Sequence, residues 1–201
     1  MKIIEELYGR YPRLKACAAD IEKAHAALLD CFRGGGKVLV CGNGGSAADA
    51  EHIVGELLKK FKKHRAVDPA TAAKLPAQLA AKLEGALPAV SLVSMSGILT
   101  AFANDVAWET AFAQQVLGLG RPGDVLIALS TSGNSANCVN AALVAKAKGM
   151  KTIAMTGADG GRLAAVADAA VRVPETETYK VQEFHLPVYH ALCAAVEDEL
   201  F

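Results

Sequence analysis

The sequence has 201 residues, of which 52% are hydrophobic, 21% charged and 5% aromatic. A chain of this length and composition buries a substantial core, which excludes an intrinsically disordered chain, a collagen-like repeat and a disulfide-stapled miniprotein, and one domain is expected. Lysine plus arginine and aspartate plus glutamate both number 21, so the formal net charge at pH 7 is +0. We therefore expect no direct nucleic-acid or membrane partner, and recognition by local sites.

The cysteines are far apart in the sequence and form no Cys-x-x-Cys pair: Cys17, Cys31, Cys41, Cys138 and Cys193. Without a disulfide framework, they indicate buried thiols of a reducing compartment. The first fifteen residues are charged and lack the apolar core of a secretory signal, and no apolar stretch is long enough to span a bilayer. These features predict a cytoplasmic protein.

The N-terminal segment, residues 1–36, is predicted to be helical. After a break at Pro12, apolar residues between 13 and 33 recur at steps of three and four along one helical stripe: Leu14, Cys17, Ile21, Ala24, Leu28 and Cys31. Three glycines at 34–36 end this helix, and the apolar run 37–41 is the first expected strand. The loop Gly-Asn-Gly-Gly-Ser follows at 42–46, and we expect Ser46 to cap the next helix.

Residues 59–88 are interpreted as a surface excursion. The run 59–65, Lys-Lys-Phe-Lys-Lys-His-Arg, is cationic, prolines interrupt the segment, and 70–83 is rich enough in alanine for one or two short helices. The cationic run lacks interleaved aromatic residues and a wider basic field. We therefore interpret it as a solvated helix end and not as a nucleic-acid patch.

Further apolar runs are expected to form strands at 89–93, 124–129, 151–155 and 169–173. Helical patterns lie between and after them, at 97–104, 109–117, 137–148, 161–166 and 178–200. Near-continuous apolar strands that alternate with helices predict an α/β fold, a three-layer αβα sandwich around a five-stranded parallel sheet, as a single domain over 1–201. Because such sheets bind ligands at the carboxyl ends of their strands, the loops that follow the strands are the candidate sites.

One of these loops, Leu-Ser-Thr-Ser-Gly-Asn-Ser at 129–135, joins a buried strand to a helix. Its hydroxyl residues are Ser130, Thr131, Ser132 and Ser135. Hydroxyl and backbone N–H donors at the positive end of a helix bind phosphate, so the loop predicts a phosphorylated metabolite as ligand. A turn that only caps the helix would explain Ser135 alone. The Walker pattern is absent and the loop at 42–46 is not GxGxxG, which argues against nucleotide binding.

Several blocks then occur in a fixed order: CGNGGSAADAEH, ANDVAWE, RPGDVLIALSTSGNSANCVNA, GMKTIAMTGADGG and KVQEFH. With them the chain resembles the sugar isomerase (SIS) domain family from Lys37 to Phe201, and within it the branch of phosphoheptose isomerase. The resemblance implies a flavodoxin-like αβα fold that binds no nucleotide, a phosphate cradle at the serine loop, and a homotetramer with active sites at subunit interfaces. It also implies the conversion of sedoheptulose 7-phosphate to D-glycero-D-manno-heptose 7-phosphate.

The resemblance further implies that Glu56 and His190 are the acid–base pair and that His52, Glu56, Gln182 and His190 are metal ligands. The residues alone show that His52 and Glu56 stand four apart on a predicted helix, so both can face one cavity. A lone histidine at such a position is more often a packing residue. Three other histidines match no family position and are left with that interpretation: His25, His64 and His185.

An aldose–ketose interconversion moves a proton between C1 and C2 through an enediol. It needs a base, an acid for the oxygens and positive charge near the developing anion. Zn²⁺ accepts imidazole nitrogen and carboxylate or amide oxygen, so it is the expected cofactor. On a straight helix Gln182 and His190 are about 12 Å apart along the axis. Either Pro187 kinks the helix or the two residues serve sites on different chains, and we prefer the second alternative.

Two further groups of residues are expected to bind the sugar. Asn43, Gly44 and Ser46 are expected to line the same pocket as the serine loop. Asn104 and Asp105 match an Asn-Asp pair of the family, which implies that Asp105 holds substrate hydroxyls. A helix stop with an Asx turn is the alternative explanation of that pair.

Three features depart from the phosphoheptose isomerase pattern: the long segment 59–88, Tyr179 in place of an acidic residue, and Pro187 inside the last helix. They bear on the identity of the sugar more than on the reaction class. The same domain also serves as a phosphosugar-binding regulator or as a non-catalytic DiaA-like adaptor that binds DnaA, and the ending Glu-Asp-Glu-Leu-Phe resembles the adaptor. A pure scaffold gains little from keeping all four proposed ligands, and the N-terminal segment is too short for a DNA-binding module, so we favour the enzyme.

Overall fold

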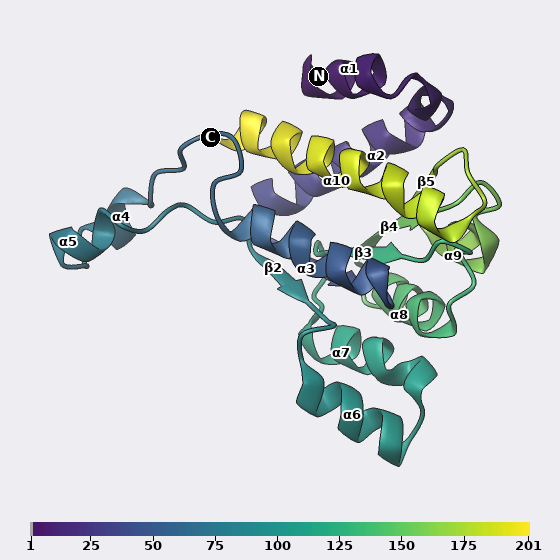
Figure 1. Ribbon diagram of the computed structural model, residues 1–201. Helices are drawn as coiled ribbons and strands as arrows, with labels where there is room; N and C mark the ends of the chain where they lie inside the picture. Colours follow the sequence, from purple (N-terminus) through teal and green to yellow (C-terminus); the bar gives the residue numbers. More distant parts are fainter. Residues whose placement is uncertain (1) are drawn as a thin grey trace.

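Five parallel strands form the centre of the protein, in the order β2-β1-β3-β4-β5 (Figure 1). The computed structural model describes residues 2–201, so Met1, the first residue of the predicted N-terminal segment, lies outside the described residues. The strands are β1 (Val38–Cys41), β2 (Ala89–Ser91), β3 (Val125–Leu129), β4 (Lys151–Thr156) and β5 (Ala169–Arg172). The predicted parallel sheet is confirmed, and its strand order is that of flavodoxin-like folds.

The two central strands carry no alternation of polar and apolar residues because both of their faces are covered. β1 and β3 pair in register from Val38 opposite Val125 to Cys41 opposite Ala128, and all their residues are buried. This is the pattern that parallel sheets in α/β proteins require. The chain leaves β1 toward one face of the sheet and β3 toward the other, so their carboxyl ends form the topological switch point where such sheets bind ligands.

Helices cover both faces of the sheet, and each face has its own apolar cluster. One face is covered by α1 (Lys2–Arg10), α2 (Ala18–Arg33), α3 (Gly45–Leu58) and α10 (Thr178–Leu200). The other is covered by α6 (Ser96–Asp105), α7 (Ala111–Leu119), α8 (Ala136–Ala147) and α9 (Gly161–Val166), with the short turn η2 (Trp108–Thr110) before α7. The two helical layers lie above and below the strands in Figure 1 and confirm the αβα sandwich.

Two local predictions differ from the structure near the N-terminus and after β1. The helix predicted from 13 to 33 is divided into a 3₁₀ turn, η1 (Pro12–Cys17), and α2. The prediction that Ser46 caps α3 is wrong. The N-cap is Gly44, whose φ of 57° lets the chain turn sharply into the helix, and Ser46 lies inside the first turn and is only 3% exposed.

The excursion predicted at 59–88 contains two short helices, α4 (Pro69–Ala72) and α5 (Ala77–Ala80), which project away from the sheet (Figure 1). The interpretation of 59–65 as a solvated helix end is wrong at its last residue. Arg65 is fully buried, and its Nε lies 2.7 Å from Glu197 Oε1. A buried guanidinium is tolerated only beside a compensating charge, and residue 197 of α10, far along the sequence, supplies it.

The cysteines are free and buried, as the sequence predicted. Burial raises the pKa of the Cys17 and Cys31 thiols to about 11, so both remain protonated and unreactive near neutral pH. Within residues 2–201 no helix combines the length and the apolar character needed to cross a bilayer.

Candidate active site

The loops after β1 and β3 meet at the switch point through a reciprocal pair of amides. Asn43 Nδ2 donates to Asn137 Oδ1 at 2.9 Å, and Asn137 Nδ2 donates to Asn43 Oδ1 at 2.8 Å. Each side chain therefore holds the other in one orientation. Sequence reasoning placed Asn43 in the pocket but missed Asn137, and the available signal was a polar residue on the otherwise apolar first turn of a buried helix.

The serine loop is held by its own hydrogen bonds. Ser130 Oγ lies 2.9 Å from Ser135 Oγ, and the Asn134 N–H donates to Ser132 Oγ at 3.1 Å. The neighbouring turn adds a further bond, because the Gly157 N–H donates to the Thr131 carbonyl oxygen at 2.9 Å. Ser130 is 3% exposed, whereas Ser132 is exposed. These bonds hold the loop in one conformation at the start of α8, which suits an anion site.

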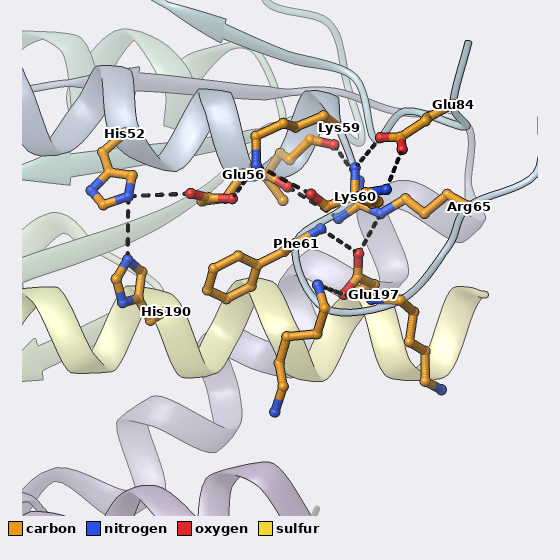
Figure 2. A network of polar contacts seen from close by, with 12 residues as sticks. His52, Glu56, Lys59, Lys60, Phe61, Arg65, Glu84, His190 and Glu197 are labelled. Atoms are coloured by element: carbon orange, nitrogen blue, oxygen red, sulfur yellow. Dashed lines mark hydrogen bonds and ion pairs between the residues drawn. The ribbon is translucent and has the colours of Figure 1, made fainter. Parts of the chain in front are cut away.

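Two imidazoles and one carboxylate converge between α3 and α10 (Figure 2). His52 Nε2 lies 3.2 Å from Glu56 Oε1 and 3.4 Å from His190 Nε2. The predicted spacing on α3 is responsible for the first contact, since residues four apart share a helix face. Burial lowers the pKa of His190, the neighbouring His52 ring lowers it further, and the Glu56 carboxylate offsets only part of this change.

The outer nitrogen of His52 is hydrogen-bonded as well. Tyr189 Oη lies 3.0 Å from His52 Nδ1 and 3.1 Å from Asp49 Oδ1. Tyr189 is 1% exposed, and burial together with the nearby Asp49 carboxylate raises the pKa of its phenol, which therefore stays protonated. Burial raises the pKa of Asp49, while the Tyr189 hydroxyl lowers it. Sequence reasoning missed both residues, because a tyrosine on a helix gives no signal of its partner.

The first residues of the excursion, 59–65, form one wall of this cluster and are called the excursion root below. The Phe61 ring lies 5.3 Å from the His190 ring, and Lys59 Nζ lies 3.0 Å from Glu56 Oε2 (Figure 2). Arg65 Nη2 donates to the Glu56 carbonyl oxygen at 3.0 Å. The excursion therefore begins at the candidate site, although its helices project away from it.

Not all predicted site residues come together within one protomer. Gln182 lies against the start of α3, because a Cβ on Gly45 would be 2.6 Å from its Nε2, and this is two helical turns before His190 on α10. α10 runs unbroken through Pro187. Asn104 and Asp105 are exposed at the end of α6, where Asn104 Nδ2 donates to Asp105 Oδ1 at 2.9 Å. The structure thus joins His52, Glu56 and His190 but not Gln182 or the Asn-Asp pair.

The described residues of one protomer do not bring all four predicted metal ligands together. Across residues 2–201, no group of three or more histidine, cysteine, aspartate or glutamate side chains is arranged to hold a metal ion. The predicted fourth ligand Gln182 lies elsewhere, and Lys59 neutralises one oxygen of Glu56. The donor types suit zinc, but a bound ion would need donors beyond those that one chain brings together.

The three histidines that were interpreted from the sequence as packing residues differ in burial. His185 is fully buried, neither ring nitrogen has a hydrogen-bond partner in the described part of the chain, and burial lowers its pKa to about 4. His25 is 8% exposed, and burial lowers its pKa too. His64 is exposed. Within residues 2–201, none of them forms a hydrogen bond or an ion pair with His52, Glu56 or His190.

Comparison with known proteins agrees with the fold described above. The sequence pattern of the SIS domain family matches residues 11–87 and 79–157. A phosphoheptose isomerase from Rhodospirillum rubrum is 44% identical over 188 residues, which cover 94% of this chain and 90% of that protein. A phosphoheptose isomerase from Akkermansia muciniphila is 39% identical over 191 residues, covering 95% and 91%.

Solved structures agree with these sequence matches. The phosphoheptose isomerase of Neisseria gonorrhoeae superimposes with a TM-score of 0.78 at 35% identity, covering 96% of this chain and 94% of that one. The phosphoheptose isomerase of Francisella tularensis gives a TM-score of 0.79 at 33% identity, covering 94% and 91%. Fold, loops and relatives therefore lead to one assignment: the chain belongs to the SIS domain family, alongside the phosphoheptose isomerases.

Proposed function

We propose that this chain is an aldose–ketose isomerase that converts sedoheptulose 7-phosphate to D-glycero-D-manno-heptose 7-phosphate. Phosphosugar isomerase activity is supported by the near full-length similarity to phosphoheptose isomerases. The observation that carries the proposal is the convergence of Glu56 and His190 on His52, at 3.2 and 3.4 Å. A carboxylate and two imidazoles at one point are the groups that proton transfer between adjacent carbons needs.

The chemistry that we assign to these residues is a proton exchange without net oxidation. One member of the Glu56–His190 pair removes a proton from C1 of the ketose, and an enediol forms. The proton is returned to C2, while the hydroxyl hydrogen of O1 is transferred to O2 through the other member. The low pKa of His190 keeps its ring neutral and able to accept a proton near neutral pH.

The serine loop is proposed to hold the phosphate of the sugar. Ser132 is exposed and Thr131 is half-buried, and the loop opens onto the first turn of α8 at the carboxyl end of β3. The reciprocal pair Asn43–Asn137 fixes the neighbouring loop, so that Gly44 is presented to the same edge of the sheet. A preorganised seat of this kind holds the substrate in place for the proton transfer.

Three further parts of the proposal concern the cofactor, the subunit assembly and the location of the protein. We propose zinc as the cofactor, held by His52, Glu56 and His190 together with Gln182, where it would supply positive charge to the developing enediolate. Because Gln182 lies apart from the other three donors in one protomer, the site is proposed to assemble between the subunits of a homotetramer. We place the protein in the cytoplasm, in keeping with its free, buried thiols.

The proposed activity is tested by incubating the purified protein with sedoheptulose 7-phosphate and measuring aldose formation. Glu56→Gln and His190→Ala are each expected to lower kcat by about 10²- to 10⁴-fold, since this is what general acid–base groups contribute. Glu51→Gln is the matched control, because Glu51 lies on the same helix and, among the described residues, accepts only from Ser94 Oγ at the surface. Equal activity of wild type and both active-site variants contradicts the proposal, and binding to an initiator protein without turnover favours the adaptor.

The zinc proposal is tested by metal analysis of the purified protein before and after chelation. We expect zinc in the untreated protein, loss of activity on its removal and recovery when zinc is returned, because the donor set consists of imidazole, carboxylate and amide groups. Full turnover by protein that contains no metal would contradict it.

A further inference from the structure

The hydrogen bonds around His52 extend beyond the proposed catalytic groups. Its Nε2 faces Glu56 and His190, whereas its Nδ1 faces away from them, toward Tyr189 Oη at 3.0 Å. The same phenol oxygen lies 3.1 Å from Asp49 Oδ1. Tyr189 therefore stands between a carboxylate and the outer nitrogen of a proposed ligand. Its ring meets that of His52 edge-on, at 5.5 Å and 74°, which orients it further.

Donor and acceptor rules restrict how these contacts can be made. An ionised carboxylate only accepts, and a phenol has one hydrogen and free lone pairs. Within residues 2–201, Tyr189 is the only side chain or backbone group that donates to the Asp49 carboxylate. If the Tyr189 hydrogen is given to Asp49, the phenol oxygen can only accept from the ring, and the hydrogen of His52 must then be on Nδ1.

Glu56 competes for that hydrogen from the other side of the ring, because its Oε1 is 3.2 Å from Nε2. Glu56 keeps a second donor in Lys59 Nζ, 3.0 Å from its Oε2. Asp49 is half-buried, and within the described residues the phenol is its only donor. Leaving Asp49 without any donor costs more than leaving Glu56 with Lys59 alone, which favours the arrangement with hydrogen on Nδ1.

We propose that Tyr189 is a positioning residue that links Asp49 to His52 and fixes the hydrogen of the neutral His52 ring on Nδ1. The lone pair of Nε2 is then directed toward Glu56 and His190. In that state the ring can accept a proton or serve as a ligand on the side where the substrate is proposed to bind. The inference rests on the proposed function for its purpose, but the hydrogen position itself is independent of turnover.

The test compares wild type, Tyr189→Phe and Tyr8→Phe as full-length, chelator-treated chains. Tyr8 is the matched control, because it is also a buried tyrosine, and its hydroxyl has no hydrogen-bond partner in the described chain. Long-range ¹H–¹⁵N spectra of histidine-labelled protein, at about pH 8 where an ordinary imidazole is neutral, show which ring nitrogen of His52 carries the hydrogen.

In wild type and Tyr8→Phe we expect Nδ1 of His52 to carry the hydrogen. In Tyr189→Phe the hydrogen is expected on Nε2, because Glu56 then remains as the only strong acceptor. A wild-type ring with hydrogen on Nε2, or a Tyr189→Phe ring identical to wild type, overturns the proposal.

Turnover gives a second readout of the same variants. Tyr189→Phe is expected to lower kcat of the metal-loaded enzyme by about 10- to 100-fold, as partners behind a ligand do, with KM nearly unchanged. Tyr8→Phe should match wild type. An unchanged kcat in Tyr189→Phe overturns the positioning role. If no variant and not even wild type turns over the ketose phosphate, the proposed function fails, and the spectra still decide the place of the hydrogen.

Discussion

At the scale of single residues, the serine loop depends on a position where no side chain fits. Gly133 has a φ of 65°, and a Cβ there would lie 2.0 Å from the Gly160 carbonyl oxygen. The obstacle is backbone of the neighbouring turn, so it has no flexible end that can move aside. Gly133 is therefore required by close approach and by conformation together.

We expect Gly133→Ala to lower the free energy of unfolding by about 1–3 kcal/mol, the usual range for a residue forced into a sparsely populated conformation. Phosphosugar affinity should fall too, because the loop must shift to relieve the contact. Urea denaturation and ligand titration measure the two effects. Gly9→Ala is the control: Gly9 lies in α1 with no atom near its Cβ position, and alanine there should stabilise the helix by about 0.5–1 kcal/mol.

At the scale of elements, one buried carboxylate of α10 binds four groups of the excursion root, and an exposed ion pair between Lys63 and Asp198 adds to it. Glu197 Oε1 accepts from the Phe61 N–H at 2.8 Å and from Arg65 Nε at 2.7 Å, and its Oε2 accepts from the N–H groups of Lys62 and Lys63 at 2.7 and 2.9 Å. Both Arg65 and Glu197 are fully buried. The Glu197 carboxylate thus holds Phe61, whose ring lies beside His190, at the candidate site (Figure 2).

Glu197→Gln is expected to lower the free energy of unfolding by about 3–5 kcal/mol, because it leaves the buried Arg65 without its compensating charge. Urea denaturation measures the loss, and cleavage by trypsin within 59–65 should become faster in the variant. Glu183→Gln is the control on the same helix. Glu183 is exposed and has no hydrogen bond or ion pair within residues 2–201, so a change of no more than about 1 kcal/mol is expected. Equal stability of the two variants would contradict the role of Glu197.

The same carboxyl predicts a pH dependence. Burial alone would raise the pKa of Glu197, but the backbone N–H groups of the excursion root and the Arg65 guanidinium lower it below its ordinary value. A depressed native pKa stabilises the fold above the unfolded pKa of about 4.3 and ceases to do so as the pH falls through the native value. The stability difference between wild type and Glu197→Gln should therefore narrow as the pH is lowered below about 4.3.

At the scale of the whole molecule, the separation of Gln182 from His190 bears on the proposed assembly. The two residues lie on one helix, yet Gln182 is next to Gly45 whereas His190 is next to His52. If a complete site takes Gln182 from a neighbouring subunit, two inactive variants can complement each other. Chains with Gln182→Ala and chains with His190→Ala, mixed under conditions that exchange subunits, would form some sites with both native residues.

We expect each variant alone to be nearly inactive. In an equal mixture about a quarter of the sites should be active, because a site needs one subunit with native Gln182 and a second subunit with native His190, and each condition is met in half of the cases. Light scattering of the same samples measures the oligomeric state, which is proposed to be a tetramer. A monomer with full activity, or a mixture as inactive as its components, would show that one chain supplies the whole site.

Most helices and strands, and the family, can be recognised from the amino-acid sequence. The apolar runs such as 125–129 could be recognised as buried strands because both faces of a parallel sheet are covered, and the order of strands and helices then leaves few topologies. The serine loop and the spacing of His52 and Glu56 were also visible, because each is formed by neighbouring residues. A sequence shows such features directly, because the residues that form them lie close together in the chain.

Contacts between residues far apart in the chain became visible only in the folded structure. Asn137 with Asn43, Tyr189 with Asp49, and Glu197 with Arg65 are each separated by more than ninety residues, and no periodicity relates one partner to the other. The structure also corrected the interpretation of residues 59–65 as a solvated helix end. A lysine-rich run is expected to be exposed, and the sequence does not show that a buried carboxylate from another element pairs with its last residue. Such pairings arise from the packing of α3, α8 and α10 on the sheet, and they exist only once the chain is folded.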